Sequence, residues 1–127
     1  MVEESIRVVY VEDEPAVAEL LRSGLDLFGV HVDPIYDTAE EAFDRIAQDE
    51  HLMASADIFV FDIRLPGMTG LELAGRLRDS GETRPILIVS AYQPPPNSQM
   101  EQLDAHFMPK PFDFPGIYNK IRELINK

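Results

Sequence analysis

Three short apolar runs constrain the fold of this chain more than any other feature of its sequence. They cover residues 6–11, 58–61 and 86–89, and each is rich in β-branched residues. A strand that is apolar on both faces is typical of a parallel sheet with helices packed on each side. The three runs therefore predict buried parallel strands.

Two further segments are predicted to be strands, although their patterns are weaker. Residues 30–35 alternate in polarity and contain Pro34, which cannot donate a hydrogen bond to a central ladder. We therefore expect this strand at an edge of the sheet. Residues 106–108 form the last predicted strand.

Segments with helical periodicity separate the strands. The first begins near Pro15. Its expected inner stripe consists of Val17, Leu20, Leu21, Gly24 and Phe28. Pairs with the spacing of a capping box mark the next three helices. These pairs are Thr38 with Glu41, Thr69 with Glu72, and Ser98 with Glu101.

The second helix is expected to end near Asp49, and the last helix to be capped by Asp113. The inner stripe of the last helix should contain Ile117, Ile121, Leu124 and Ile125. The fourth helix is expected to be short or irregular, because a run of three prolines at residues 94–96 cannot be helical.

Five strands that alternate with five helices predict an α/β fold, a doubly wound five-stranded parallel sheet with helices on both faces. The chain has 127 residues and is 45% hydrophobic, so residues 1–127 are expected to form a single domain. Folds of this kind bind ligands at the carboxyl ends of the strands. The residues that follow the strands are therefore the candidates for a functional site.

The charge of the chain limits its partners. It has 11 Lys and Arg residues against 23 Asp and Glu residues, and the net charge of −12 argues against direct nucleic-acid binding. The chain has no cysteine, so it has no disulfide and is compatible with the reducing interior of a cell. We therefore expect a cytoplasmic location. The apolar stretch within residues 1–10 is shorter than a signal peptide requires, and no run of about 18 apolar residues occurs, so we expect neither export nor a membrane span.

Polar residues follow four of the predicted strands. They are Glu12, Asp13, Asp62, Ser90 and Lys110. Three crowded carboxylates repel one another unless a cation neutralises them, and a ligand set made only of oxygen favours Mg²⁺. Magnesium, a lysine and a hydroxyl group are also the groups that stabilise a phosphoryl group in transfer. Asp62 is therefore predicted to be a nucleophile that accepts phosphate.

Four sequence pieces carry a resemblance to a known family. They are VYVEDE at residues 9–14, FDIRLPGMTG at residues 61–70, VSA at residues 89–91 and PKPF at residues 109–112. Over essentially its full length the chain resembles the receiver domain of response regulators in two-component, or phosphorelay, signalling. The resemblance implies the strand order 2-1-3-4-5 and a stand-alone, single-domain switch.

The resemblance also implies how the site works. Asp62 would accept a phosphoryl group from a phosphohistidine of a sensor histidine kinase or a histidine phosphotransfer protein. Asp13 and Asp62 would bind Mg²⁺ directly, Glu12 would bind it through water, and Arg64 would contribute its backbone carbonyl. The protein would be a phosphorylated switch and not an enzyme, with at most slow self-catalysed phosphorylation and dephosphorylation.

Further roles follow from the same resemblance. Lys110 would pair with the phosphoryl group, and a conformational change would pass through Ser90 and the switch residue Phe107. Arg64 and Tyr92 occupy positions that tune the lifetime of the phosphoryl group, and both are bulky, so we predict slow autodephosphorylation. The Lys110–Pro111 peptide bond is expected to be cis.

Two regions depart from the receiver pattern. Residues 51–56 lengthen the connection before the third strand, which is expected to have little energetic effect. Residues 94–96 replace the start of a helix that forms much of the partner surface in typical receivers. We hypothesise that this proline run is an extended, partner-specific surface, and we expect a monomer or a weak dimer. The downstream target is not indicated by the sequence.

Other readings of the same residues stay open. Taken singly, Asp13 is compatible with a helix cap, Asp62 with a turn residue, and Lys110 with a surface charge. Phe107 is also compatible with a fixed core residue, although the switching role is favoured. The alternatives for the whole chain are a receiver-like docking module that does not turn over phosphate, and a small phosphatase with an aspartyl-phosphate intermediate.

Overall fold

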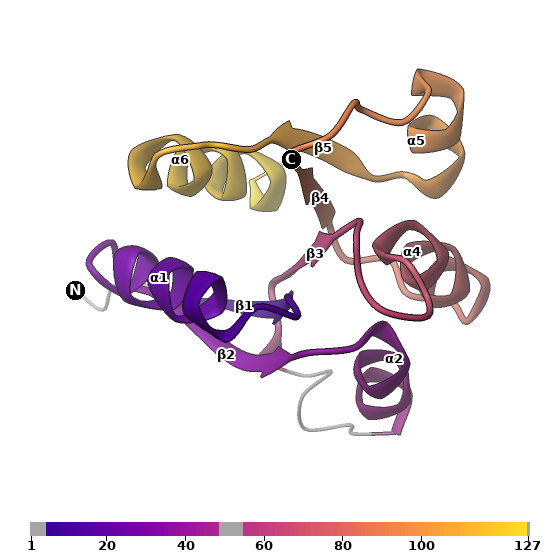
Figure 1. The fold of residues 1–127 in the computed structure, drawn as a ribbon, viewed down its shortest axis with the longest axis horizontal. Coiled ribbons are helices and arrows are strands. Elements are labelled where there is room, and N and C mark those ends of the chain that lie inside the picture. Colours follow the sequence, from indigo (N-terminus) through magenta and orange to yellow (C-terminus); the bar gives the residue numbers. More distant parts are fainter. Residues whose placement is uncertain (1–4, 49–54, 127) are drawn as a thin grey trace.

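The computed structural model describes residues 5–48 and 55–126. A five-stranded sheet with the order β2-β1-β3-β4-β5 lies at its centre, and all four neighbouring pairs of strands are parallel (Figure 1). The strands are β1 (Ile6–Val11), β2 (Val30–Tyr36), β3 (Ile58–Asp62), β4 (Ile86–Ser90) and β5 (His106–Pro109). The predicted fold class and strand order are confirmed.

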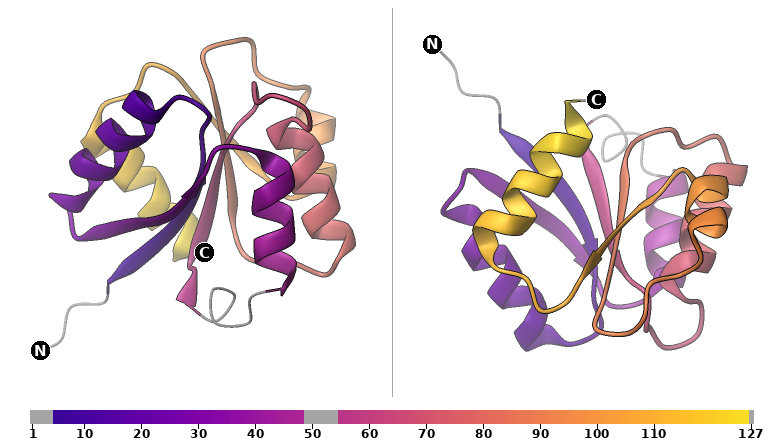
Figure 2. Two further views of the ribbon diagram at one scale, coloured as in Figure 1. Left: turned by 60° about the horizontal axis from the view of Figure 1, so that its bottom comes forward. Right: turned by 90° about the horizontal axis from the view of Figure 1, so that it is seen from above.

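Helices cover both faces of the sheet. They are α1 (Pro15–Asp26), α2 (Ala39–Gln48), α4 (Gly70–Asp79), α5 (Asn97–Leu103) and α6 (Phe114–Ile125). Helices α1 and α6 lie on one face, and α2, α4 and α5 lie on the other (Figures 1 and 2). In the described part of the chain no helix has the length and apolar character needed to cross a bilayer.

The alternation of side chains along the strands divides the core into two clusters. In β1, Val8 and Tyr10 pack with residues of α1 and α6, whereas Val9 and Val11 pack with residues of α2 and α4. The central strands β3 and β4 are buried at every position, as two-sided burial requires. The apolar runs in the sequence therefore correspond to the central strands.

Strand β2 lies at the edge of the sheet, as Pro34 predicted. Its register against β1 shifts by one residue, because Val8 pairs with Val32 while Tyr10 pairs with Ile35. The extra residue falls at the Asp33–Pro34 step. Proline has no backbone donor, and neither an edge position nor a local bulge requires one.

Three of the predicted helix caps are present. Thr69 and Glu72 form a complete capping box, Thr38 Oγ1 accepts a hydrogen bond of 3.2 Å from the Glu41 amide, and Asp113 accepts one from the Gly116 amide. The cap predicted at Ser98 is wrong. Helix α5 begins at Asn97 with Pro96 at its N-cap and no side-chain cap, so Ser98 lies inside the first turn.

The predicted inner stripe of the first helix needs two corrections. The buried residues of α1 are Ala18, Leu21, Gly24 and Leu25. Leu20 is 63% exposed, and Phe28 lies beyond the end of the helix, where its ring stacks on Tyr118 with the centroids 4.8 Å apart. The prediction placed the large apolar side chains inside, whereas the helix turns the small Ala18 towards the sheet.

The fourth predicted helix, α5, is short, as expected, with seven residues. The proline run before it has no regular structure, and Pro94 and Pro96 are exposed. The Lys110–Pro111 bond is cis, as predicted. Most of the insertion predicted at residues 51–56 lies outside the described residues.

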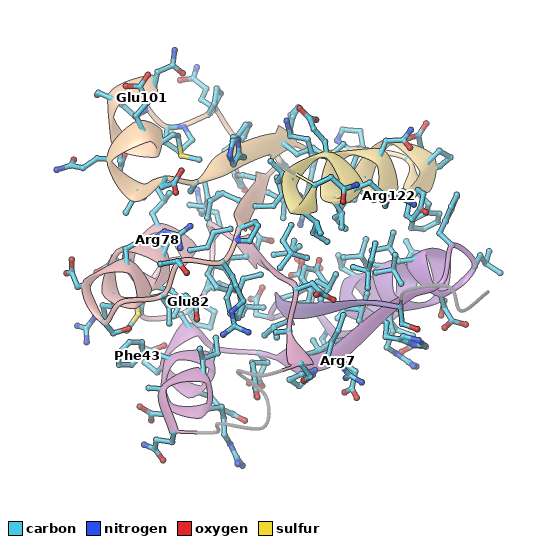
Figure 3. The ribbon with its side chains drawn as sticks, turned by 180° about the vertical axis from the view of Figure 1, so that it is seen from behind. Arg7, Phe43, Arg78, Glu82, Glu101 and Arg122 are labelled. Atoms are coloured by element: carbon cyan, nitrogen blue, oxygen red, sulfur yellow. The ribbon has the colours of Figure 1, made fainter. Side chains whose placement is uncertain are left out.

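Two arginines form hydrogen bonds with Glu82, in the segment that leads into β4. Arg78 donates to the backbone carbonyls of Glu82, Leu103 and Asp104 at 2.7–2.8 Å. Figure 3 shows Arg78 and Glu82 beside one another. Arg84 binds both carboxylate oxygens of Glu82 at 2.8–2.9 Å, and the Glu82 side chain is only 4% exposed. Burial opposes the charge of Glu82, but the hydrogen bonds from Arg84 outweigh it and lower the pKa of Glu82.

We expect Glu82→Gln to lower the free energy of unfolding by about 2 kcal/mol near pH 7, because it breaks charge-assisted hydrogen bonds to Arg84. The folded-state pKa of Glu82 is lowered. Its contribution is therefore complete above the unfolded pKa and is lost as the pH falls through the folded pKa. The difference between wild type and variant in urea unfolding should shrink from pH 7 to pH 3.

The matched control is Glu123→Gln, which removes an exposed carboxylate paired with Lys120 at 3.5 Å. Its effect should stay within about 0.5 kcal/mol at both pH values. An equal loss for the two variants at pH 7, or a difference at Glu82 that does not change with pH, would contradict this account of the Glu82 ion pair.

Candidate functional site at the carboxyl edge of the sheet

Four polar residues lie where four strands end. Glu12 follows β1, Asp62 ends β3, Ser90 ends β4, and Lys110 follows β5. Glu12, Asp62 and Ser90 are all buried, with 3%, 8% and 1% of their surface exposed. Polar groups at these depths need partners, because an unpaired buried charge is costly. The contacts among them define the candidate site.

Lys110 joins two of the carboxylates. Its Nζ lies 2.9 Å from Asp62 Oδ2 and 3.2 Å from Glu12 Oε1. The Lys110 amide donates to the Ser90 carbonyl at 2.8 Å, which holds the lysine beside the end of β4. One ammonium group thus bridges acids that are 50 residues apart in the sequence, at positions 12 and 62.

Burial and charge oppose each other in this site. Burial raises the pKa of Glu12, and the neighbouring Asp62 charge adds to the rise, while Lys110 and the Glu14 amide act against it. Burial also disfavours the charged form of Lys110. The hydrogen bonds and negative charges of Asp62 and Glu12 outweigh that effect and raise the pKa of Lys110. The lysine therefore stays protonated and neutralises part of the acidic charge.

Asp62 is held by its own loop as well as by the lysine. Its Oδ1 accepts a hydrogen bond of 3.2 Å from the Arg64 amide. Gly70, at the start of α4, lies so close to the end of β3 that a Cβ there would collide with the Asp62 carbonyl. The Gly70 amide donates to the Ile63 carbonyl at 3.1 Å. Only glycine permits this close approach of the helix to the site.

Glu40, in the first turn of α2, binds the loop that follows Asp62. Its Oε2 accepts a hydrogen bond of 3.0 Å from the Met68 amide, and it lies against Gly67, whose φ is +76°. This contact ties α2 to the loop that follows β3. No local sequence signal points to Glu40, because its partner is 28 residues away.

A group of three acids offers ligand atoms to a cation. The carboxylate oxygens of Glu12, Asp13 and Glu14 lie within 4.8 Å of one another, and the latter two side chains are exposed. Glu14 had no predicted role. Among the described residues, Asp62 lies outside this group. The donor set contains only oxygen, which fits the hard ion Mg²⁺.

Ser90, the predicted relay residue, lies one position beyond the residue of β4 that pairs with Asp62. Its Oγ accepts a hydrogen bond of 3.1 Å from the Tyr92 amide. Phe107 pairs with Ile88 of β4 and packs, half-buried, on the core cluster shared with α4 and α5. Its place beside α5 is compatible with both a switch and a core residue.

The two residues predicted to tune the phosphoryl lifetime are in contact. The Arg64 guanidinium lies over the Tyr92 ring, with Cζ 4.3 Å from the ring centroid. Tyr92 is 60% exposed, and Arg64 is exposed as well. The pair connects the loop after β3, whose Arg64 amide binds Asp62, with the loop after β4. The sequence alone did not predict this contact.

Curated relatives give the first comparison. Response regulator MprA of Mycobacterium bovis is 33% identical over 126 residues, which cover 97% of this chain and 52% of that protein. Response regulator MprA of Mycobacterium ulcerans is 32% identical over the same length. The chain thus spans about half the length of the curated relatives that it matches.

Solved structures give the second comparison. A CheY-like response regulator receiver domain protein from Methanospirillum hungatei JF-1 has a TM-score of 0.81 at 25% identity, covering 97% of this chain and 95% of that one. The BeF3-activated N-terminal receiver domain of Klebsiella pneumoniae RstA shares the fold, with a TM-score of 0.80 at 23% identity and coverage of 95% and 99%.

The sequence profile of the response regulator receiver domain matches residues 8–122. This match includes every residue that meets at the carboxyl edge of the sheet. Together with the relatives and the fold, it shows that the chain belongs to the receiver domain family of response regulators, the phosphorylation-dependent switches of two-component signalling.

Proposed function

We propose that Asp62 accepts a phosphoryl group from a phosphohistidine of a sensor histidine kinase or a histidine phosphotransfer protein. The observation that carries this proposal is the contact of 2.9 Å between Lys110 Nζ and Asp62 Oδ2 at the carboxyl edge of the sheet. An ammonium group at this distance orients the carboxylate and neutralises charge when phosphate oxygens approach. Asp62 is buried overall, but 12% of its side chain is exposed to solvent.

The proposed reaction includes Mg²⁺. As the resemblance implied, Asp13, Asp62 and the Arg64 carbonyl would hold the ion directly and Glu12 through water, and Glu14 is an additional candidate ligand. The ion would screen the charge between the incoming phosphoryl group and the carboxylates. Residues of the chain would position the nucleophile, because Lys110 orients Asp62 and Glu12 keeps Lys110 in place.

The proposed switch runs from the site to the face of α5. Ser90 would turn from the Tyr92 amide towards the phosphoryl group, and Phe107 would move in response. The new phosphate adds about −1.5 to −2 charges, which suffices to bias a loop with two states. The proline run at residues 94–96 lies between Ser90 and α5, and its role as a partner surface stays a prediction.

The direct test of the proposal uses acetyl phosphate. We expect the intact mass to rise by one phosphoryl group when Mg²⁺ is present, and not when EDTA removes the ion. An adduct that forms equally well in EDTA would contradict the part assigned to Mg²⁺. No adduct under any condition would favour the docking module. The phosphatase alternative requires a second acid two residues after Asp62, where Arg64 stands.

The Arg64–Tyr92 contact gives a prediction about lifetime. We expect Arg64→Asn and Tyr92→Ala each to speed loss of the phosphoryl group roughly threefold, the factor that an exposed cation–π contact can supply. The physical reason is that either change uncovers the acyl phosphate to water. The decay of the adduct after removal of acetyl phosphate, followed by intact mass, measures this rate.

The same kind of contact on α6 supplies the control. Arg122, in the last turn of α6, lies over the ring of Tyr118, with Cζ 5.8 Å from the ring centroid. Arg122→Asn and Tyr118→Ala should leave the decay rate unchanged. A decay rate that stays the same in both Arg64→Asn and Tyr92→Ala would show that this pair does not shield the phosphoryl group.

A further inference from the structure

Tyr10 places a hydroxyl group inside the core. It lies in β1 with 1% of its surface exposed, and it belongs to the cluster packed against α1 and α6. The hydroxyl donates a hydrogen bond of 3.1 Å to Glu12 Oε1. Residues two apart in a strand face the same side, which allows the contact between Tyr10 and Glu12. A buried hydroxyl is costly without such a partner.

The same oxygen of Glu12 also binds the lysine. Glu12 Oε1 accepts from Tyr10 and from Lys110 Nζ, and Glu12 Oε2 accepts from the Glu14 amide at 3.2 Å. Lys110 in turn contacts Asp62. A continuous chain of hydrogen bonds therefore runs from Tyr10 through Glu12 and Lys110 to Asp62. Such networks orient charged side chains more firmly than single bonds do.

The side chain of Tyr10 is packed in the core cluster between the sheet and helices α1 and α6. It lines an apolar groove of about 380 Å³ together with Leu21, Ala91 and the side chain of Lys110. The Tyr10 ring and the lysine therefore share both the groove and the site. Phenylalanine would fill the same volume as the tyrosine ring, so the hydroxyl adds a contact to Glu12 that packing does not require.

We propose that Tyr10 is a positioning residue of the phosphoacceptor site. Its hydroxyl fixes the carboxylate of Glu12, so that Glu12 holds Lys110 against Asp62 and meets the divalent cation in one orientation. This inference rests on the proposed function. Partners that hydrogen-bond to the carboxylates of a metal site commonly contribute to metal affinity through this kind of orientation.

The test is Tyr10→Phe, which removes only the hydroxyl. Titration of the unphosphorylated protein with Mg²⁺, followed by calorimetry, should show affinity weaker by about fivefold, the value of one ordinary hydrogen bond. Phosphorylation by acetyl phosphate should slow at low Mg²⁺ and recover at saturating Mg²⁺. A purely structural role of Tyr10 would not produce this recovery.

Tyr118→Phe is the control, because it removes a hydroxyl that accepts from Arg122 on α6. It should leave Mg²⁺ affinity at the wild-type value. A second measurement needs no metal: the ¹³C shift of the Glu12 carboxylate should move in Tyr10→Phe and stay in Tyr118→Phe. Unchanged or tighter Mg²⁺ binding, or an unmoved shift, in Tyr10→Phe would overturn the inference. Absence of a phosphoryl adduct in wild type would instead overturn the proposed function.

Discussion

Asp62→Asn should abolish the phosphoryl adduct that acetyl phosphate forms on the wild-type protein. The amide has nearly the shape of the carboxylate but lacks the negative oxygen that attacks phosphorus. It also removes the charge partner of Lys110, which lies 2.9 Å from Asp62 Oδ2. We expect the intact mass to stay that of the unmodified chain after incubation with donor and Mg²⁺.

The control for this result is Asp113→Asn. Asp113 caps α6 through the Gly116 amide, and asparagine is an equally good cap, so this variant should form the adduct as wild type does. Adduct formation by Asp62→Asn at the wild-type rate would show that another side chain is the acceptor. The fold should survive both changes, which circular dichroism checks.

Lys110→Met should slow phosphorylation about a hundredfold, the effect of removing one group that stabilises charge in a transition state. It should also lower the free energy of unfolding by about 2 kcal/mol at pH 7, because Glu12 and Asp62 lose the cation between them. Lys110 is 20% exposed, so solvent reaches the site and keeps this loss below that of a fully buried pair.

The pH dependence of Lys110→Met has a definite sign. Burial already raises the pKa of Glu12, and the positive charge of Lys110 limits that increase. Without Lys110 the folded-state pKa of Glu12 rises further, so the variant loses stability as the pH rises through that value. Urea unfolding should show the deficit at pH 7 and a smaller one at pH 5.

Lys120→Met is the matched control for the lysine. Lys120 pairs with Glu123 on the surface of α6 at 3.5 Å. It should change stability by no more than about 0.5 kcal/mol and leave phosphorylation unchanged. Equal effects of the two substitutions would mean that the contacts of Lys110 have no special part in the site.

The sequence predicted the parts of the site that depend on strand ends. Parallel strands bring their carboxyl ends to one edge, so Glu12, Asp62, Ser90 and Lys110 could be placed together without coordinates. The edge position of β2 followed in the same way from Pro34, because proline lacks the backbone donor of a central strand.

The contacts between side chains were beyond sequence reasoning. The hydrogen bond of Glu40 to the Met68 amide and the stacking of Arg64 on Tyr92 join segments that are distant along the chain, and their geometry depends on how the loops pack. Tyr10 was interpreted only as an apolar residue of the first strand. Its hydrogen bond to Glu12 becomes visible only when the side chains are placed.

The errors in the helices have local causes. Leu20 was expected inside α1, but the helix presents Ala18 and Leu25 to the sheet and leaves Leu20 beside the groove. The predicted stripe included Leu20 and Phe28 and left out Ala18 and Leu25, so it lay to one side of the face that contacts the sheet. Ser98 had the spacing of a cap, yet the backbone already starts the helix at Asn97.

The most direct test of the account locates the phosphoryl group on the chain. Borohydride reduces an aspartyl phosphate to homoserine with release of phosphate, and peptide mass spectrometry then identifies the modified residue. After incubation with acetyl phosphate and Mg²⁺, homoserine should appear at position 62. Homoserine at position 13, or phosphate retained on Ser90 after reduction, would contradict the assignment of Asp62 as the acceptor.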